Sequence, residues 1–240
     1  MTITTRTESV STDDGNFDAT AIVPEGGGPG ILLFQEIFGV GDFILDRAHA
    51  LAAEGYVVLC PDVFWRIEPN VAVDHDEAGL QKAFGLAGQF GQQDPQLTIG
   101  DLLASVAHLR SMPETEGGIA VMGYCLGGSL AFEAAVAGDP ECCVSYYGST
   151  VASRIDEAPR MECPAIFHFG GADPYIASAD VERVRDALSD RADVVVHIHE
   201  GAGHAFENSF APMFHNAEAT EASWQMTLDF LHANLPRLSD

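Results

Sequence analysis

The chain has 240 residues, of which 47% are hydrophobic, and its 11 Lys and Arg against 36 Asp and Glu give a net charge of −25 at pH 7. This hydrophobic content is sufficient for a folded core, which excludes an intrinsically disordered chain. The few scattered cations cannot form the basic stripe that binds phosphate backbones or anionic lipid. We therefore expect neither nucleic acid nor membrane as a partner.

Segment lengths and cysteine usage narrow the class further. The longest apolar runs, such as Gly30–Phe34, fall far short of the roughly 18 residues of a membrane span. Residues 1–15 are polar and acidic, unlike a signal peptide. The 5 cysteines form no C-x-x-C pair and are odd in number, which favours free thiols in a reducing compartment. We expect a cytoplasmic protein with one domain over residues 1–240, as a monomer or a homodimer.

Strand and helix patterns alternate along the chain. Thr4–Val10 and Asp18–Val23 predict a hairpin that turns at Asp13–Gly15, and an irregular loop is expected over Pro24–Gly30. Strands are then predicted at Ile31–Phe34, Tyr56–Cys60, Gly118–Met122, Cys142–Tyr147, Cys163–Phe169 and Val194–His199, and helices at Asp42–Glu54, Asp74–Phe90, Pro95–Arg110, Leu126–Ala137, Ala177–Leu188 and Ala217–Ala233. This order predicts an α/β fold with a mostly parallel sheet and helices on both faces. The Gly- and Gln-rich segment 68–94 is expected to form a lid or rim.

A strand–turn–helix pattern surrounds Cys125. The strand at Gly118–Met122 leads through Gly123-Tyr-Cys-Leu-Gly127 into the helix at Leu126–Ala137. This is the nucleophile-elbow pattern with Cys in place of Ser. The helix N-terminus favours a thiolate, and the Leu126 N–H points to where an oxyanion would form. The alternative is a buried structural cysteine in a Gly-rich loop.

Two later strand ends supply an acid and a base in the order that this architecture requires. Asp173 follows Gly170-Gly-Ala after one strand, and His204 follows Gly201-Ala-Gly after the next. Ligands bind at this edge of open α/β sheets, so we expect Cys125, His204 and Asp173 to form a catalytic triad. A metal site made of His197, His199 and His204 is the competing interpretation, although no thiolate or carboxylate follows at ligand spacing.

Five motifs in order make the chain resemble the dienelactone hydrolase family of α/β-hydrolases. They span residues of about 15 to 232, and the first and third together are specific. The motifs are Gln35–Gly39, Cys60–Phe64, Gly123–Gly128, Gly170–Asp173 and Gly203–Phe206. The resemblance implies an α/β-hydrolase fold and a hydrolase that needs neither cofactor nor metal.

The resemblance also implies roles for particular residues. Cys125 would be the nucleophile, His204 the general base and then acid, and Asp173 the group that orients His204. The Ile37 and Leu126 amides would form the oxyanion hole. Glu36 would lie beside the thiol. It would hold the resting cysteine in its less reactive thiol form and take the thiol proton when substrate arrives.

The sequence departs from the best-known members at the two arginines that bind the substrate carboxylate. The corresponding positions are Leu80 and Asn208. Nearby cations are limited to Arg66 and Lys82, whereas the aromatic residues suggest an apolar substrate pocket. The pocket residues predicted are Leu80, Phe84, Phe206 and Asn208, with Phe90 and Phe210 as further aromatic candidates. An acidic chain without both arginines is expected to take a neutral substrate.

The sequence thus predicts a hydrolase of small esters or lactones that works through a cysteine acyl-enzyme. Two alternatives stay open. One is a carboxymethylenebutenolidase that acts on dienelactone itself, with cations reaching the site from elsewhere in the chain. The other is a non-hydrolytic protein that uses Cys125 for redox sensing or uses the fold for binding.

Overall fold

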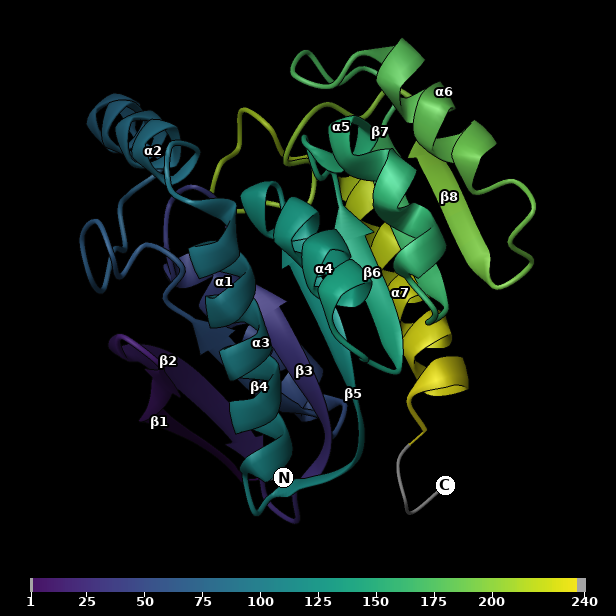
Figure 1. Cartoon of the computed structure of the whole chain (residues 1–240). Helices are drawn as coiled ribbons and strands as arrows, with labels where there is room; N and C mark the ends of the chain where they lie inside the picture. Colours follow the sequence, from purple (N-terminus) through teal and green to yellow (C-terminus); the bar gives the residue numbers. More distant parts are fainter. Residues whose placement is uncertain (1, 237–240) are drawn as a thin grey trace.

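The computed structural model describes residues 2–236 and contains one eight-stranded sheet with the order β1-β2-β4-β3-β5-β6-β7-β8 (Figure 1). Strands β3 to β8 are mutually parallel, while β1 and β2 pair antiparallel. The strands are β1 (Ile3–Thr12), β2 (Gly15–Pro24), β3 (Gly28–Phe34), β4 (Val57–Pro61), β5 (Thr115–Tyr124), β6 (Cys142–Tyr146), β7 (Ala165–Gly170) and β8 (Val194–His199). The predicted α/β class is confirmed.

Helices cover both faces of this sheet, as the alternating pattern predicts. In Figure 1, α3, α4 and α6 lie in front of the sheet and α7 lies behind it. Arg47 of α1 stacks on Trp224 of α7, which places α1 on the same face as α7. The helices are α1 (Asp42–Ala53), α2 (Glu77–Phe90), α3 (Pro95–Ser111), α4 (Leu126–Ala137), α5 (Val151–Arg154), α6 (Ser178–Ala187) and α7 (Ala217–Asn234), with a 3₁₀ turn η1 (Ile155–Arg160).

Two local expectations need correction. The loop expected over Pro24–Gly30 ends early, because the Gly28 N–H donates to the Glu114 carbonyl and Gly28 pairs with Thr115 at the start of β5. The short helices over Val151–Arg160 are absent from the prediction. They have fewer turns than a periodic pattern needs, and Pro159 lies inside the second one.

The core lies between the central strands and the helices on either side. Residues of β4, β6 and β7 are buried throughout, which explains why these strands are apolar without alternation. Cys60, Cys142, Cys143 and Cys163 are buried free thiols, as expected for packing residues. Cys125 differs from these four in being partly exposed.

Helix α2 stands apart from the two helical layers, at the end toward which the parallel strands point (Figure 1). Asp76 caps it by accepting a hydrogen bond from the Gly79 N–H at 2.8 Å. It begins at Glu77, three residues after the predicted start at Asp74, because Asp76 has extended backbone angles. Within residues 2–236, no helix combines the length and the apolar character needed to cross a membrane.

Candidate active site

Cys125 occupies a strained turn between β5 and α4. Its backbone has φ of 56° and ψ of −114°, a left-handed conformation that side-chain-bearing residues rarely adopt. The turn is held by the Cys125 N–H, which donates to the Tyr146 carbonyl at 3.0 Å. A Cβ at Gly127 would lie 2.3 Å from the Phe34 carbonyl oxygen, so only glycine lets α4 approach β3 this closely. Strain of this kind is typical of functional positions.

The three residues of the predicted triad lie in hydrogen-bonding contact. His204 Nε2 is 3.1 Å from Cys125 Sγ, and His204 Nδ1 is 2.7 Å from Asp173 Oδ2. The other oxygen of Asp173 accepts from the Tyr175 and Ile176 N–H groups at 2.7 and 3.1 Å. The Asp173 carboxylate is therefore fixed by backbone donors, and it fixes the imidazole ring in turn.

The contacts of His204 determine its charge. Burial alone lowers the pKa of an imidazole, but hydrogen bonds to Asp173 and Cys125 and the charges of both groups outweigh it. They raise the pKa of His204 from 6.5 to about 10. The imidazolium form is therefore favoured at neutral pH, with a sulfur acceptor on one nitrogen and a carboxylate on the other.

Glu36 is buried, and one of its oxygens is held by a neutral side chain. Its Oε2 accepts from Asn208 Nδ2 at 2.7 Å, and the same Asn208 nitrogen lies 2.9 Å from His75 Nε2. Asn208 Oδ1 accepts from the Phe210 N–H at 3.0 Å, which fixes the amide so that its NH₂ group faces Glu36 and His75. Glu36 Oε1 is buried with no hydrogen-bond partner in the described part of the chain.

A cavity of about 240 Å³ opens beside the Cys125 and His204 side chains. Leu80 and Phe84 of α2 line it, as predicted for the substrate pocket. The prediction for Phe206 and Asn208 is corrected: both are fully buried and lie behind the wall. The lining residues are Glu36, Ile37, Phe38, Leu80, Phe84, Ala87, Cys125, Ser149, Tyr175, His204, Ala205 and Phe214.

The reason for this correction is packing behind the site. The Phe206 ring lies 5.2 Å from that of Tyr147 and 4.9 Å from that of His199, so it fills the core. Asn208 turns its amide to Glu36 rather than to the cavity. Of the two other aromatic candidates, Phe210 is exposed at the surface and Phe90 packs against Phe64.

The cations near the predicted pocket are engaged with acidic residues elsewhere. Arg66 binds Asp14 at 2.6 Å and Asp101 at 2.8 Å, and Lys82 binds Glu68 at 2.6 Å. In residues 2–236, neither Lys nor Arg lines the 240 Å³ cavity. Arg66 and Lys82, the two cations nearest to the predicted pocket in the sequence, are therefore bound to acidic residues outside the cavity.

The histidines proposed for a metal lie apart from His204 in their contacts. His199 Nε2 lies 3.0 Å from His168 Nδ1, and the His197 ring packs on the His199 ring at 4.4 Å. Both nitrogens of His204 face Asp173 and Cys125 instead. Burial lowers the pKa of His199 to about 4, which keeps this ring neutral at physiological pH.

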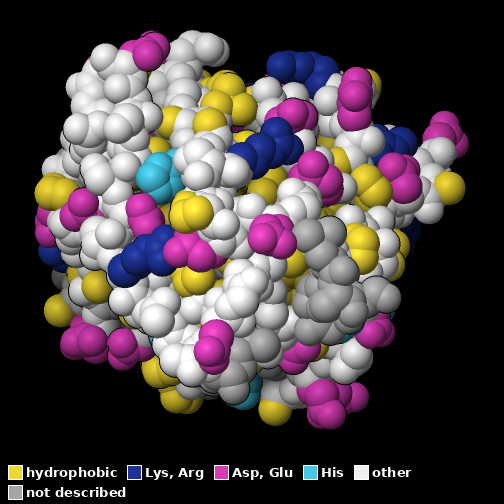
Figure 2. All heavy atoms as spheres, turned by 90° about the horizontal axis from the view of Figure 1, so that it is seen from below, with side chains coloured by type: hydrophobic (Ala, Val, Ile, Leu, Met, Phe, Trp, Pro, Cys, Tyr) yellow, Lys and Arg dark blue, Asp and Glu magenta, His cyan; other side chains and the backbone are white. Residues whose placement is uncertain are grey.

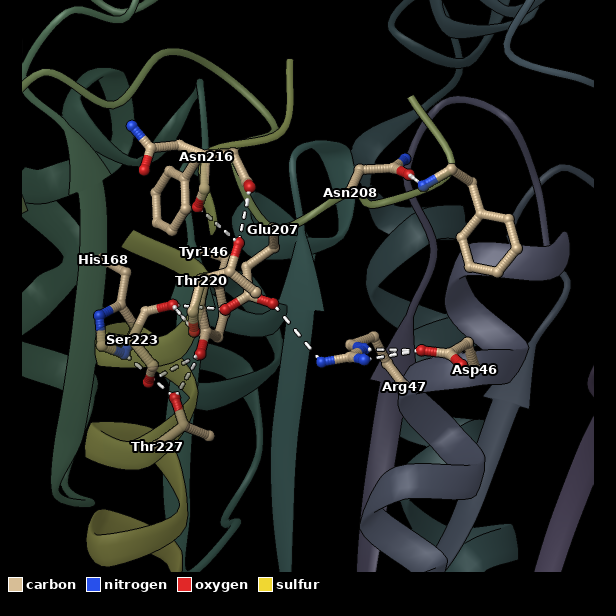
Figure 3. A network of polar contacts seen from close by, with 12 residues as sticks. Asp46, Arg47, Tyr146, His168, Glu207, Asn208, Asn216, Thr220, Ser223 and Thr227 are labelled. Carbon is tan, nitrogen blue, oxygen red and sulfur yellow. Dashed lines mark hydrogen bonds and ion pairs between the residues drawn. The ribbon is translucent and has the colours of Figure 1, made fainter. Parts of the chain in front are cut away.

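A buried polar network joins α1, α7 and the sheet (Figure 3). Glu207 accepts a short hydrogen bond from Ser223 of α7, and its second oxygen lies 3.7 Å from Arg47 of α1. The Tyr146 hydroxyl contacts Thr227 at 2.6 Å. Burial, only partly offset by Ser223 and Arg47, raises the pKa of Glu207 from 4.5 to about 7.

Sequence reasoning missed several residues of the site region. His75 contacts Asn208, Tyr175 lines the cavity, and Tyr147 places its ring 5.2 Å from that of His204. Tyr175 lies in a loop, and His75 lies before the N-cap of α2 although the sequence predicts a helix from Asp74, so no helical face placed either residue at the site. The φ of 39° at Tyr147, directly after β6, leaves no mark in the sequence. The one signal in the sequence that points to Tyr147 as a site residue is a tyrosine at the end of a predicted strand.

Comparison with solved structures identifies the fold as that of the α/β-hydrolases. A dienelactone hydrolase-like promiscuous phosphotriesterase from metagenomic libraries superposes with a TM-score of 0.83, at 24% identity, over 98% of this chain and 99% of that chain. A dienelactone hydrolase from Anabaena variabilis gives a TM-score of 0.73, at 18% identity, over 98% and 100% of the two chains.

Residues 17–235 match the dienelactone hydrolase family, and the chain belongs to this family. It is 37% identical to a carboxymethylenebutenolidase of Pseudomonas sp. strain P51, over 96% of this chain and 97% of that protein. A carboxymethylenebutenolidase of Pseudomonas putida is 33% identical over 85% of each chain. The protein is accordingly a carboxylic ester or lactone hydrolase.

Proposed function

We propose that this enzyme hydrolyses neutral esters or lactones through an acyl-enzyme on Cys125. The observation that carries the proposal is the chain of contacts from Asp173 through His204 to Cys125 Sγ, at 2.7 and 3.1 Å. A sensor or binding protein has no need of a base aligned on the thiol by a buried carboxylate. This arrangement therefore favours a hydrolase over the redox-sensing alternative.

In the proposed reaction, the Cys125 thiol gives its proton to Glu36, and the thiolate, beside the imidazolium of His204, attacks the substrate carbonyl. The developing oxyanion would be bound by the Ile37 and Leu126 amides; both residues lie beside Cys125. His204 then gives its proton to the leaving alkoxide as the C–O bond breaks. Water, deprotonated by His204, attacks the thioester and releases the acid, and the thiolate recovers its proton from Glu36.

We also propose that Glu36 controls the protonation of the Cys125 thiol. It and Cys125 line the same cavity, and one oxygen of Glu36 has no described partner. That oxygen is available to accept the thiol proton, the role that the family resemblance gives it. Its other oxygen is bound to the neutral Asn208 rather than to an arginine.

The neutral-substrate proposal rests on charge. Glu36 and Asp173 bring negative charge to the site, whereas the neighbouring cations Arg66 and Lys82 are paired elsewhere. An anionic lactone would lose its hydration without gaining a bidentate partner. The names of the curated relatives favour a second candidate, dienelactone hydrolysis, and a comparison of anionic with neutral lactones separates the two.

We further propose that residues 1–240 act as one catalytic domain, with segment 68–94 as the rim of the site. Helix α2, at the centre of this segment, supplies Leu80, Phe84 and Ala87 to the cavity wall. Phe84 is half exposed, which suits a residue that a substrate covers on binding.

The decisive test is the hydrolysis of p-nitrophenyl acetate by the wild type, Cys125→Ala and Cys163→Ala. Cys125→Ala should lose at least about a thousandfold in kcat/KM, because the nucleophile is removed. Cys163→Ala removes a buried thiol that does not line the cavity beside Cys125, and it should retain the wild-type rate. Equal rates in the wild type and Cys125→Ala would overturn the proposal. Rapid alkylation of Cys125 without turnover would favour the sensing alternative.

A further inference from the structure

A second and larger cavity, of about 340 Å³, also opens at Cys125. It shares Cys125, Ile37, Ala87 and Ser149 with the first cavity but extends toward α3, α4 and α5. Cys125 thus has space on two sides. The residues lining this cavity are Ile37, Ala87, Phe90, Gly91, Gln93, Pro95, Thr98, Cys125, Leu126, Ser129, Leu130, Glu133, Ser149, Thr150 and Arg154.

The position of His204 decides which part of an ester enters which cavity. The leaving alkoxide must lie within hydrogen-bond reach of the imidazole that protonates it. His204 lines the first cavity and is absent from the described lining of the second. The alcohol portion therefore belongs in the first cavity. The acyl chain lies on the other side of the same carbonyl carbon. It therefore belongs in the second cavity.

We propose that the second cavity is the acyl-binding subsite of this enzyme, and that it takes an extended neutral acyl chain. This inference rests on the hydrolase function proposed above. It changes the expected substrate, because a small lactone ties its acyl and alkoxide portions into one ring and cannot fill both cavities. The substrate class is then an open-chain ester with a group on each side of the carbonyl.

The walls of the second cavity define the chemistry of the acyl chain. Leu126, Leu130 and Phe90 give the cavity apolar wall surface. Gln93 Nε2 is a buried donor with no hydrogen-bond partner in the described structure, so a matching chain carries a keto, ether or ester oxygen there. Such an oxygen would satisfy the amide at no cost in charge.

A carboxylate on the acyl chain is disfavoured, although Arg154 lines the second cavity. Arg154 donates to Glu157 at 2.6 Å and lies 3.5 Å from Glu133. Glu133 also lines the cavity, and burial is the main cause that raises the pKa of its carboxyl group. One guanidinium shared between two carboxyl groups has no free bidentate face for a substrate anion.

The test compares two series of p-nitrophenyl and alkyl esters, one lengthened in the acyl chain and one in the alcohol. The wild type should gain about fourfold in kcat/KM per methylene added to the acyl chain until the cavity is filled. Thr98→Trp should fill the second cavity and lower the ratio of long-chain to acetate kcat/KM, measured within the same variant, by at least about tenfold, whereas its preference along the alcohol series should match that of the wild type. Gln96→Trp, exposed on the same helix, is the matched control and should behave as wild type.

A second pair of variants tests the acceptor without adding bulk. Gln93→Leu should lose the preference for acyl chains that carry a keto or ether oxygen over hydrocarbon chains of equal length, by about tenfold, because the donor is gone. Gln92 is exposed and lies next to Gln93, so Gln92→Leu is the matched control. This pair remains informative if Thr98→Trp does not fold.

The outcomes separate the two proposals. Loss of the Cys125 dependence of acetate hydrolysis would refute the hydrolase proposal itself. Cys125-dependent acetate hydrolysis with a flat acyl-length series, or with a preference that Thr98→Trp and Gln93→Leu leave intact, would refute the acyl subsite alone. Faster turnover of small neutral lactones than of all extended esters would also refute it.

Discussion

At the scale of the residue, Asn208 carries a specific consequence for stability. It donates one N–H to the buried Glu36 carboxylate at 2.7 Å and directs the other at His75 Nε2 at 2.9 Å. In the absence of Asn208, this Glu36 oxygen would be a buried anionic acceptor without a donor. An unsatisfied charged group of this kind is more costly than a lost neutral hydrogen bond.

We therefore expect Asn208→Leu to lower the free energy of unfolding by about 1–3 kcal/mol at neutral pH. His75→Phe keeps the ring contact with Phe38 and leaves the Asn208–Glu36 bond in place, so its loss should be smaller. Urea denaturation of both variants measures the difference. A larger loss in His75→Phe than in Asn208→Leu would contradict this account of how Glu36 is held.

At the scale of the element, the tight β5–Cys125–α4 turn depends on glycine. A Cβ at Gly123 would lie 2.1 Å from the Gly127 carbonyl oxygen, and one at Gly127 would meet the β3 backbone. Helix α2 offers the opposite case: Gly85 lies in its interior, and a Cβ added there would meet no atom within 4 Å. The same substitution should thus have opposite effects in the two helices.

Gly127→Ala is expected to destabilise the protein by about 3 kcal/mol, because backbone atoms cannot move aside cheaply. Gly85→Ala should stabilise it by about 0.5–1 kcal/mol, because alanine loses less conformational entropy in a helix. Thermal unfolding of the two variants against the wild type checks both signs. Similar melting temperatures for all three proteins would refute this view of the turn.

The network around Glu207 links elements and predicts a pH dependence. Burial raises the pKa of Glu207 to about 7 in the folded protein, from 4.5. Between these two values the folded state binds a proton that the unfolded state releases. The stability contribution of this carboxyl group is therefore present at low pH and lost as the pH rises through about 7.

Glu207→Gln removes the charge and keeps the shape. We expect it to raise the free energy of unfolding by up to about 3 kcal/mol at about pH 8, with the gain shrinking toward about pH 5. Loss of the Arg47 partner, 3.7 Å away, reduces this gain. Chemical denaturation across this pH range measures it. A gain that is constant with pH, or larger at low pH, would contradict the raised pKa.

At the scale of the whole molecule, the acidic excess is distributed over the surface. Figure 2 shows one face on which acidic side chains are spread widely, with basic side chains beside some of them. Since 11 cations cannot neutralise 36 acidic residues, most of the −25 charge repels itself across the folded surface.

Salt should therefore stabilise the protein at neutral pH. Raising the ionic strength from about 0.01 to 1 M shortens the Debye length from about 30 to 3 Å and screens this repulsion. We expect the melting temperature to rise with NaCl, although the surface ion pairs weaken at the same time. Urea unfolding in the same salts provides an independent measurement, and a melting temperature that falls with added NaCl would refute the prediction.

The sequence by itself determined the order of the eight strands and of the longer helices along the chain, and it singled out Cys125, Asp173 and His204. Hydrophobic periodicity and short Gly-rich turns are local properties, and the carboxyl ends of parallel strands necessarily meet at one edge of the sheet. These two properties predict that the three residues lie near one another. The sequence also determines the acidic net charge and has Leu80 and Asn208 where other family members have the two substrate-binding arginines.

Only the tertiary structure decided which side chains face the substrate. Phe206 turns into the core while Phe214 lines the cavity, and His75 meets Asn208 across 133 positions of the chain. Such choices depend on packing between segments distant in sequence, and no local pattern encodes them. For the same reason, the second cavity at Cys125 emerged only when α2, α3, α4 and α5 were placed around it.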